Sequence, residues 1–331
     1  MSSNFANKTI FVTGGSGFVG ANLVKRLVDQ GSHVVVLERD RTSPNSLDVF
    51  GLRQRVTVVT GMVEDLILIE RALNEYQPSI VFHLAAQALV NTANRSPLST
   101  FEANIRGTYV LLEACRRANP QPVVAVASSD KAYGSHDILP YSEDFPLQGT
   151  FPYDVSKSCT DLIAQSYAKT YKMNITVTRS ANIYGPGDMN LSRVIPGTII
   201  SVLRGERPII RSDGTPIREF IHVDDVVDGY LTVADNIDKA SGQAFNFGSD
   251  EPVQILELVQ KIIRIADRES DISPDILLDR KIEREIDAQY LSGEKIEKAL
   301  NWRPRIGLDE GLASSVEWYK GHLEKFHGAA A

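Results

Sequence analysis

Short apolar runs recur through the first half of the chain, and each is separated from the next by a longer stretch of mixed polarity. These runs are rich in Val and Ile and predict strands over residues 8–14, 33–38, 56–61, 79–85, 122–128 and 174–180. Amphipathic segments such as GANLVKRLVDQG and TYVLLEACRRANP lie between most of them and favour helices. Strands that are apolar on both faces and alternate with helices are typical of a parallel sheet covered on both sides. The pattern therefore predicts an α/β fold of the doubly wound Rossmann type.

The pattern changes from about Asn182 onward, where YGPGDMNLSRVIP is rich in loop-forming residues. After a helical run, the sequence predicts short strands and then further helices near residues 208–212, 218–223, 253–266 and 307–323. We therefore expect a Rossmann domain over 1–181 and a smaller lobe over 182–331. Part of this lobe, 219–249, is expected to return to the main sheet, because AFNFGS has the pattern of one more strand.

Glycines follow the first predicted strand directly in FVTGGSGFVGANLVKRL, where the chain turns into a helix. Gly14, Gly17 and Gly20 suit a tight turn, the close approach of a pyrophosphate and close packing of the helix on its strand. The helix N-terminus, with Phe18 and Val19, offers free N–H groups and a partial positive charge to that pyrophosphate. A strand, this loop and a helix in that order predict a dinucleotide-binding domain.

An acid stands at the end of the second predicted strand. Glu38 there can accept hydrogen bonds from ribose hydroxyls and repel a 2′-phosphate, which favours NAD over NADP. Arg39 and Arg41 follow it and could instead attract a 2′-phosphate, which would favour NADP. The alternative for Glu38 is a solvated charge at a strand end.

Composition narrows the range of partners. The net charge of -7 and the pI near 5.5 argue against nucleic acid or a membrane surface as a partner. No apolar run approaches the ~20 residues of a membrane span, and the N-terminus lacks a secretory pattern, so we expect a cytoplasmic protein. Cys115 and Cys159 form neither a CxxC nor a zinc pattern, and we expect no metal site.

A tyrosine and a lysine lie four residues apart in FPYDVSKSCTDLIAQSY, a segment that predicts a helix entered after Pro152. At that spacing Tyr153 and Lys157 share one helix face. A phenol titrates near pH ~10, so Tyr153 needs a neighbouring cation to act as a base at neutral pH, and Lys157 can supply it. Taken alone, the spacing fits two surface residues better. After a nucleotide loop and a strand that ends in Ser-Ser, a catalytic pair is favoured.

Six motifs follow one another along the chain: TGGSGFVG, HLAAQ, SSDKAYG, the Tyr153/Lys157 pair, RSANIYGPGD and REFIHVDDV. Together they resemble the motifs of the extended short-chain dehydrogenase/reductases that act on nucleotide sugars. The resemblance implies NAD as the cofactor, a nucleotide-diphosphate sugar as the substrate and a homodimer. That dimer would be a four-helix bundle, for which the candidate helices are 99–118 and 153–172.

The resemblance also implies further residues along the cofactor: Met62, Val63, Leu84, Ala85, Ala86, Gln87 and Asn104. Met62 stands where the family usually has an aspartate that contacts adenine. Near the sugar nucleotide, the resemblance implies Asn182, Arg193, Arg211, Arg218 and Arg284. Arginine suits a diphosphate because its fork binds phosphate oxygens bidentately. The alternative for each arginine is a solvated surface charge.

The motif SSDKAYG distinguishes the reactions of this family. Its members first oxidise C4 of the sugar; a 4-epimerase then returns hydride to the other face, whereas a 4,6-dehydratase eliminates water across C5 and C6. Ser129-Asp130-Lys131 is similar to the CDP-glucose 4,6-dehydratases. That similarity implies that Ser129 bonds the 4-oxygen, Asp130 protonates the departing 6-hydroxyl and Lys131 takes the C5 proton.

Other functions stay open. Adjacent opposite charges at a strand end often form a simple ion pair, which would leave Asp130 and Lys131 as bystanders of a 4-epimerase or related oxidoreductase. A non-catalytic NAD-binding protein is a third reading, since a fold does not fix a function, but the intact Ser129, Tyr153 and Lys157 set argues against it. The glycine loop and REFIH differ from those of CDP-glucose dehydratases. The resemblance therefore supports the dehydratase chemistry more than the cytidine base.

Overall fold

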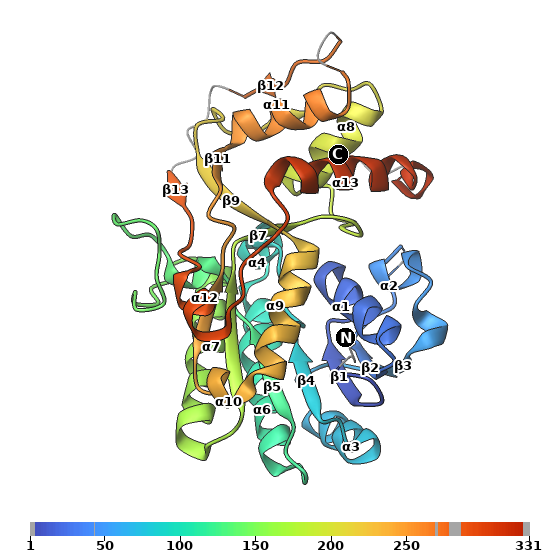
Figure 1. Cartoon of the computed structure of the whole chain (residues 1–331), viewed down its shortest axis with the longest axis vertical. Helices are drawn as coiled ribbons and strands as arrows, with labels where there is room; N and C mark the ends of the chain where they lie inside the picture. Colours follow the sequence, from blue (N-terminus) through green and yellow to red (C-terminus); the bar gives the residue numbers. More distant parts are fainter. Residues whose placement is uncertain (1–3, 43, 269–270, 278–285, 327–331) are drawn as a thin grey trace.

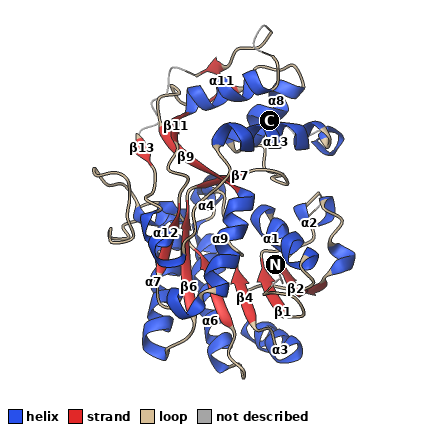
Figure 2. Ribbon diagram, in the orientation of Figure 1, coloured by secondary structure: helices blue, strands red, loops and turns tan. Residues whose placement is uncertain are grey.

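A seven-stranded parallel sheet forms the centre of the protein (Figures 1 and 2). The computed structural model describes all residues except 1–3, 43, 269–270, 278–285 and 327–331. The strand order is β10-β6-β5-β4-β1-β2-β3. The strands are β1 Thr9–Thr13, β2 His33–Glu38, β3 Thr57–Thr60, β4 Ile80–His83, β5 Val123–Ala127, β6 Ile175–Ser180 and β10 Ala244–Phe247. The predicted doubly wound α/β fold is confirmed.

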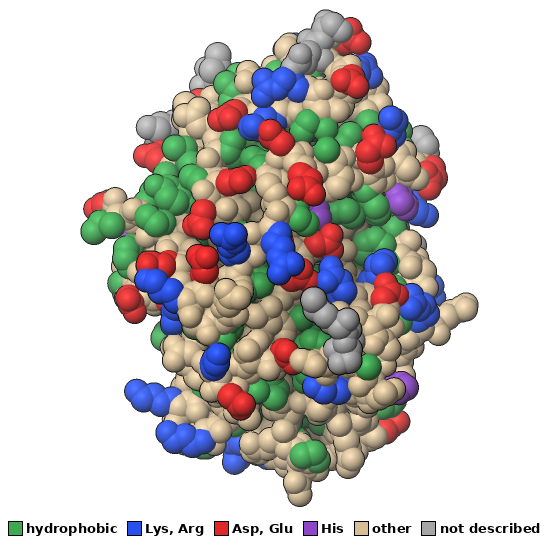
Figure 3. Space-filling view, viewed as in Figure 1, with side chains coloured by type: hydrophobic (Ala, Val, Ile, Leu, Met, Phe, Trp, Pro, Cys, Tyr) green, Lys and Arg blue, Asp and Glu red, His purple; other side chains and the backbone are tan. Residues whose placement is uncertain are grey.

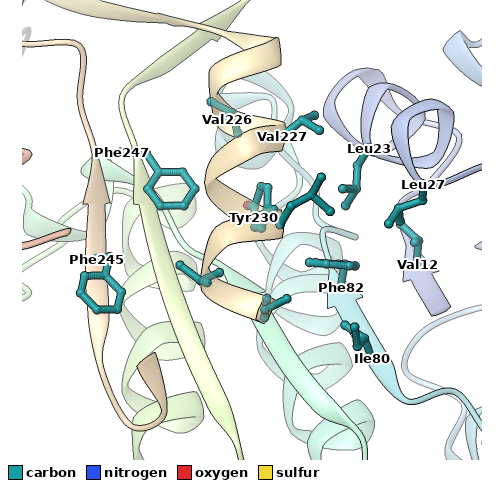
Figure 4. Close-up of a cluster of buried hydrophobic side chains, with 14 of the residues drawn as sticks. Val12, Leu23, Leu27, Ile80, Phe82, Val226, Val227, Tyr230, Phe245 and Phe247 are labelled. Carbon is teal, nitrogen blue, oxygen red and sulfur yellow. The ribbon is translucent and has the colours of Figure 1, made fainter. Parts of the chain in front are cut away.

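Helices cover both faces of this sheet because its strands are apolar on both sides. On one face pack α1 Phe18–Asp29 and α9 Val223–Asp235, and on the other α3 Leu66–Tyr76, α6 Gly107–Arg117 and α7 Pro152–Tyr171. Strand β1 shows the alternation: Ile10 and Val12 face the first group, whereas Phe11 faces the second. Figure 4 shows the first core, in which Tyr230 of α9 lies among side chains of β4, β10 and α1.

The helix expected over 99–118 is interrupted. The segment begins as α5 Pro97–Phe101, passes through a π-helical turn at Glu102–Arg106 and continues as α6. A π-helical turn is rare and is frequently found at functional sites. Here it carries Asn104, which is buried.

A smaller lobe lies beyond the carboxyl ends of the main strands (Figure 1). Its sheets have the orders β11-β9-β13, with β7 beside β9, and β12-β8. The strands are β7 Asn182–Tyr184, β8 Ile209–Ile210, β9 Ile217–His222, β11 Pro252–Gln254, β12 Asp275–Ile276 and β13 Ala288–Gln289. Around them lie α8 Val194–Leu203, α11 Ile255–Ile265 and α13 Leu308–Lys320. The short helices α2 Ser46–Val49, α4 Val90–Arg95, α10 Ile237–Ala240 and α12 Glu294–Leu300 pack instead on elements of the main domain.

The space-filling view in Figure 3 shows Lys and Arg side chains interspersed with Asp and Glu on one face. Mixed signs of this kind are typical of an ordinary solvated surface. Among the described residues, no helix has both the length and the apolar character that crossing a membrane requires.

Candidate active site

The turn between β1 and α1 is built on close backbone contacts. Gly14 has a φ of +74°, and a Cβ there would lie 2.7 Å from the Ala85 nitrogen. A Cβ at Gly20 would lie 2.1 Å from the Gly14 carbonyl oxygen, so only glycine allows α1 to approach β1 this closely. Helix α1 begins at Phe18, and its N-cap Gly17 makes no side-chain cap, which leaves N–H groups for a ligand. This cradle fits a dinucleotide pyrophosphate.

Glu38 at the end of β2 is engaged by a partner that the sequence did not suggest. Its carboxylate is 3% exposed and accepts two hydrogen bonds from Arg53, at 2.8 and 3.0 Å. Arg53 also donates to Asp48 at 2.5 Å. The ribose role of Glu38 stays a prediction, and it would have to be shared with this arginine clamp. Arg39 is exposed and bonded to Asp40.

The loop after β4 lies against the glycine turn, and the loop after β3 lies against the start of α6. Met62 is half exposed, whereas Val63 is buried against Gly107. Leu84, Ala85, Ala86 and Gln87 continue from the end of β4. Asn104 fixes this second loop, because its Oδ1 accepts from the Gln87 nitrogen at 2.7 Å and its Nδ2 donates to the Gln87 carbonyl at 3.1 Å. The same Nδ2 donates to Ser156 Oγ at 2.8 Å, which links the loop to α7.

Tyr153 and Lys157 lie in the first turns of α7, with Pro152 at the start of the helix. Lys157 Nζ donates to the Ala127 carbonyl at the end of β5, at 2.8 Å. Burial lowers the pKa of Lys157 to about 8, against a smaller opposing effect of Asp161. Burial raises the pKa of Tyr153 to about 12, and a side-chain hydrogen bond with Ser129 works in the opposite direction. Near neutral pH, Tyr153 is therefore a neutral phenol, whereas most of Lys157 still carries its proton.

Ser129, Asp130 and Lys131 lie where β5 runs into a short 3-10 helix, Asp130–Tyr133. Ser129 Oγ donates to Asp130 Oδ1 at 2.9 Å, and Lys131 Nζ donates to Asp130 Oδ2 at 2.9 Å. Asp130 is 3% exposed, whereas the Lys131 side chain is 21% exposed. The two charges therefore contact each other, as the ion-pair alternative requires.

A second contact on Lys131 was not suggested by the sequence. Gln289 of β13 accepts a hydrogen bond from Lys131 Nζ through its Oε1 and donates through Nε2 to the Asp130 carbonyl at 3.1 Å. Asp154, next to Tyr153, is also buried nearby. Burial raises its pKa to about 6, while the charge of Lys131 lowers it.

One cleft of about 700 Å³ brings the predicted groups together. Its walls include Ser129, Asp130, Lys131, Tyr153 and Lys157, so the ion pair opens to the same space as the tyrosine and the lysine of α7. Val19, Leu84 and Ala86 line it from the cofactor side. Asn182, Arg193 and Arg218 line it from the other lobe.

The structure does not place two of the predicted substrate-binding residues at this cleft. Arg211 is exposed and does not line this cleft, and Arg284 lies outside the described residues. Arg193 donates to the buried Asp188 at 2.9 Å, which fixes it at the cleft wall. In the part of the chain that the structure describes, no cluster of three His, Cys, Asp or Glu side chains could hold a metal ion.

The model of the NAD dependent epimerase/dehydratase family matches residues 10–248. The chain belongs to this family. NAD is the family's cofactor, and the glycine cradle at Gly14 and Gly20 fits it. Structures similar to the chain include a dTDP-glucose 4,6-dehydratase from Streptomyces venezuelae solved with NAD, which has a TM-score of 0.86 at 28% identity over 96% of this chain and 98% of that one.

Relatives of this family member include enzymes of both reaction types. CDP-glucose 4,6-dehydratase of Salmonella typhimurium is 30% identical over 332 residues, which cover 96% of this chain and 91% of that enzyme. A UDP-glucose 4-epimerase from Thermotoga maritima, solved with UDP-glucose, has a TM-score of 0.86 at 30% identity, over 95% of this chain and 99% of that one. The similarity therefore supports an NAD-dependent nucleotide-sugar enzyme and does not separate a dehydratase from an epimerase.

Proposed function

We propose that the protein is an NAD-dependent nucleotide-sugar 4,6-dehydratase, with a CDP-glucose-like substrate favoured. One observation carries the proposal. Asp130 and Lys131 line the same cleft as Tyr153 and Lys157, so an acid and a base are available next to the groups that oxidise C4. A 4-epimerase has no use for this second pair, because it needs only to return hydride to the opposite face.

Oxidation at C4 would be carried out by Tyr153, Ser129 and Lys157. Bound NAD supplies the acceptor for the hydride that leaves C4. Tyr153 takes the proton of the 4-hydroxyl, and Ser129 bonds the 4-oxygen from beside it. Burial holds the pKa of Tyr153 at about 12, so the nearby Lys157 ammonium is needed to stabilise the phenolate.

Elimination requires a protonated Asp130 and an unprotonated Lys131. The hydrogen bond between the two side chains can produce both protonation states at once. Lys131 Nζ already donates to Asp130 Oδ2 at 2.9 Å. Transfer of that one shared proton converts the ion pair into a carboxylic acid and an amine. Exclusion of water by a bound sugar favours the transfer, since a neutral pair loses less on desolvation than two ions do.

The sugar nucleotide would lie across the cleft between the two lobes. Arg193 and Arg218 suit its diphosphate, and Asn182 would bind near it. We keep Arg211 and Arg284 as candidates of the same kind. The division between an NAD-binding domain over 1–181 and a nucleotide-sugar lobe over 182–331 is part of this proposal.

We also propose a homodimer that pairs α5 and α6 with α7 in a four-helix bundle. Large apolar side chains are exposed on these helices: Leu98 is 72% exposed, Tyr109 42% and Leu162 56%. A neighbouring copy would cover them. Leu162→Glu should then shift the mass in solution from a dimer to a monomer, measured by light scattering, and an unchanged dimer mass would contradict this arrangement.

The 4-epimerase stays the second candidate, because the ion pair and the epimerase relatives also fit it. Incubation with CDP-glucose, UDP-glucose, UDP-N-acetylglucosamine and GDP-mannose separates the two. Loss of one water in the product mass supports the dehydratase, whereas mass-neutral conversion supports the epimerase. Binding of NAD without turnover would favour a binding protein.

A lysine variant tests the assignment of the base. Lys131→Met should abolish loss of water while C4 oxidation stays measurable by the absorbance of the reduced nicotinamide. Lys169→Met, an exposed lysine of the same helix as Tyr153, is the matched control and should keep both reactions. Full dehydration by Lys131→Met would show that another group removes the C5 proton.

A further inference from the structure

The carboxamide of Gln289 binds both halves of the Asp130-Lys131 segment. Its Oε1 accepts from Lys131 Nζ, and its Nε2 donates to the Asp130 carbonyl at 3.1 Å. Gln289 is 1% exposed, so neither bond competes with solvent. The partners are 158 and 159 residues apart in the chain. A fold-level constraint therefore holds Lys131 in addition to its neighbour Asp130.

The pairing of β13 with β9 fixes the position of Gln289. It lies in β13, in parallel register with Arg218 of β9. Arg218 lines the cleft, as does Lys131. The backbone of Gln289 is thus held beside the candidate diphosphate-binding Arg218, while its side chain reaches the Asp130-Lys131 segment of the cleft wall, where elimination would occur.

A free lysine side chain has four rotatable bonds and loses rotamer entropy when it is fixed. Asp130 and Gln289 occupy two of the three N–H directions of the Lys131 ammonium, which leaves one direction for the cleft. Once the proton has passed to Asp130, rotation about the Cε–Nζ bond turns the lone pair of the amine to that direction. An amide oxygen can do this without adding a negative charge. A carboxylate in the same place would hold the ammonium form, in which Lys131 cannot accept a proton.

We propose that Gln289 is a positioning residue for elimination, which holds the Lys131 nitrogen at the cleft wall, within reach of the sugar C5–H. The proposal rests on the dehydratase function proposed above. In the step concerned, the C5–H bond breaks and its proton goes to the unprotonated Lys131 amine. The electron pair forms the C5=C6 double bond, the C6–O bond breaks, and the oxygen leaves as water with the proton of Asp130.

Gln289→Met tests this with the full-length protein and saturating NAD. We expect C4 oxidation within about threefold of the original rate and loss of water at least tenfold slower, since a hydrogen bond to a charged group is lost. KM for the sugar nucleotide should stay nearly constant, because the effect falls on kcat. Gln254→Met, on β11 at the other side of β9, is the matched control and should change neither reaction.

Gln289→Glu keeps the shape and adds a charge, so it remains informative where Gln289→Met folds poorly. The charged groups around Lys131 are Asp130 in its own segment, Asp154 of α7 and Arg218 across from position 289. An added carboxylate should move the half-maximal pH for water loss upward by about one unit while C4 oxidation keeps its profile. Thermal unfolding and NAD binding, followed by protein fluorescence, check that both variants are folded.

Three results would overturn the positioning role. They are water loss within twofold of the original rate in Gln289→Met, a parallel fall of oxidation and water loss, and an unshifted pH profile in Gln289→Glu. If the unaltered protein itself releases no water from any of the four sugar nucleotides, the dehydratase proposal fails and this one falls with it. If that protein releases water and the variants match it, only the role of Gln289 fails.

Discussion

Replacing Gly20 by alanine should disrupt both folding stability and NAD binding. The added Cβ would meet three backbone atoms: the Gly14 oxygen at 2.1 Å, the Gly14 carbonyl carbon at 2.8 Å and the Gly15 Cα at 2.8 Å. Ordinary contact begins near 3.4 Å, so α1 must move away from the turn by more than 1 Å. None of the three obstacles is a side chain that can rotate aside.

Overpacking of this kind costs 1–3 kcal/mol, and a contact with backbone on every side places Gly20→Ala at about 3 kcal/mol. For a chain of this size, that corresponds to a fall of roughly 4 °C in the midpoint of thermal unfolding. NAD affinity, measured by calorimetric titration, should fall at least tenfold, because the N–H groups of α1 move with the helix.

Gly17→Ala is the comparison. Its Cβ would meet only the Gly14 oxygen, at 3.3 Å, so the unfolding midpoint should stay within about 2 °C of the original. The methyl group would still stand beside the N-terminus of α1, so NAD affinity should fall. Equal stability and equal NAD affinity of Gly20→Ala and the original protein would refute the argument that a backbone crossing requires this glycine.

Three further substitutions test buried charges. The Lys157 amine loses its proton near pH 8 in the folded protein and near pH 10.5 in the unfolded chain, so the free energy of unfolding rises by up to roughly 3 kcal/mol between these pH values. Lys157→Met should lack this rise, which thermal unfolding at pH 7 and 9.5 would show. Asp161→Asn should lower the free energy of unfolding in urea by about 3–5 kcal/mol, because Arg179, 3% exposed, would keep its charge while the carboxylate that accepts from it at 2.8 and 3.0 Å becomes a neutral amide with one acceptor oxygen. A loss under about 1 kcal/mol would contradict this. Glu219 is buried, which raises its pKa to about 7 from 4.5, so stability should decline as the pH rises between these values, and Glu219→Gln should lack that decline in melts at pH 5 and 8.

The main sheet was predictable because its strands are long, apolar on both faces and separated by helices. The strands of the second lobe were harder, since β7, β11 and β13 have three, three and two residues and show no periodicity. The helix over 99–118 had a continuous apolar pattern, which gives no signal for the π-helical turn at Glu102–Arg106.

The reaction residues were predictable in part. Ser129, Asp130 and Lys131 follow a strand directly, and Tyr153 and Lys157 have helical spacing, so local patterns carry them. Gln289 had no local signal, because its role depends on the register of β13 with β9. Arg53 likewise had no local signal in the sequence; it begins a short 3-10 helix, Arg53–Arg55, and its role follows from its contact with Glu38.

The position of β10 has a consequence for synthesis of the chain. This strand closes one edge of the main sheet against β6, yet it comes after β7, β8 and β9 along the chain. A nascent chain that ends at residue 181 can hold the other six strands but leaves the backbone groups of β6 uncovered on one side. Open strand edges are templates for aggregation, so the emerging chain needs protection until residue 247 has left the ribosome.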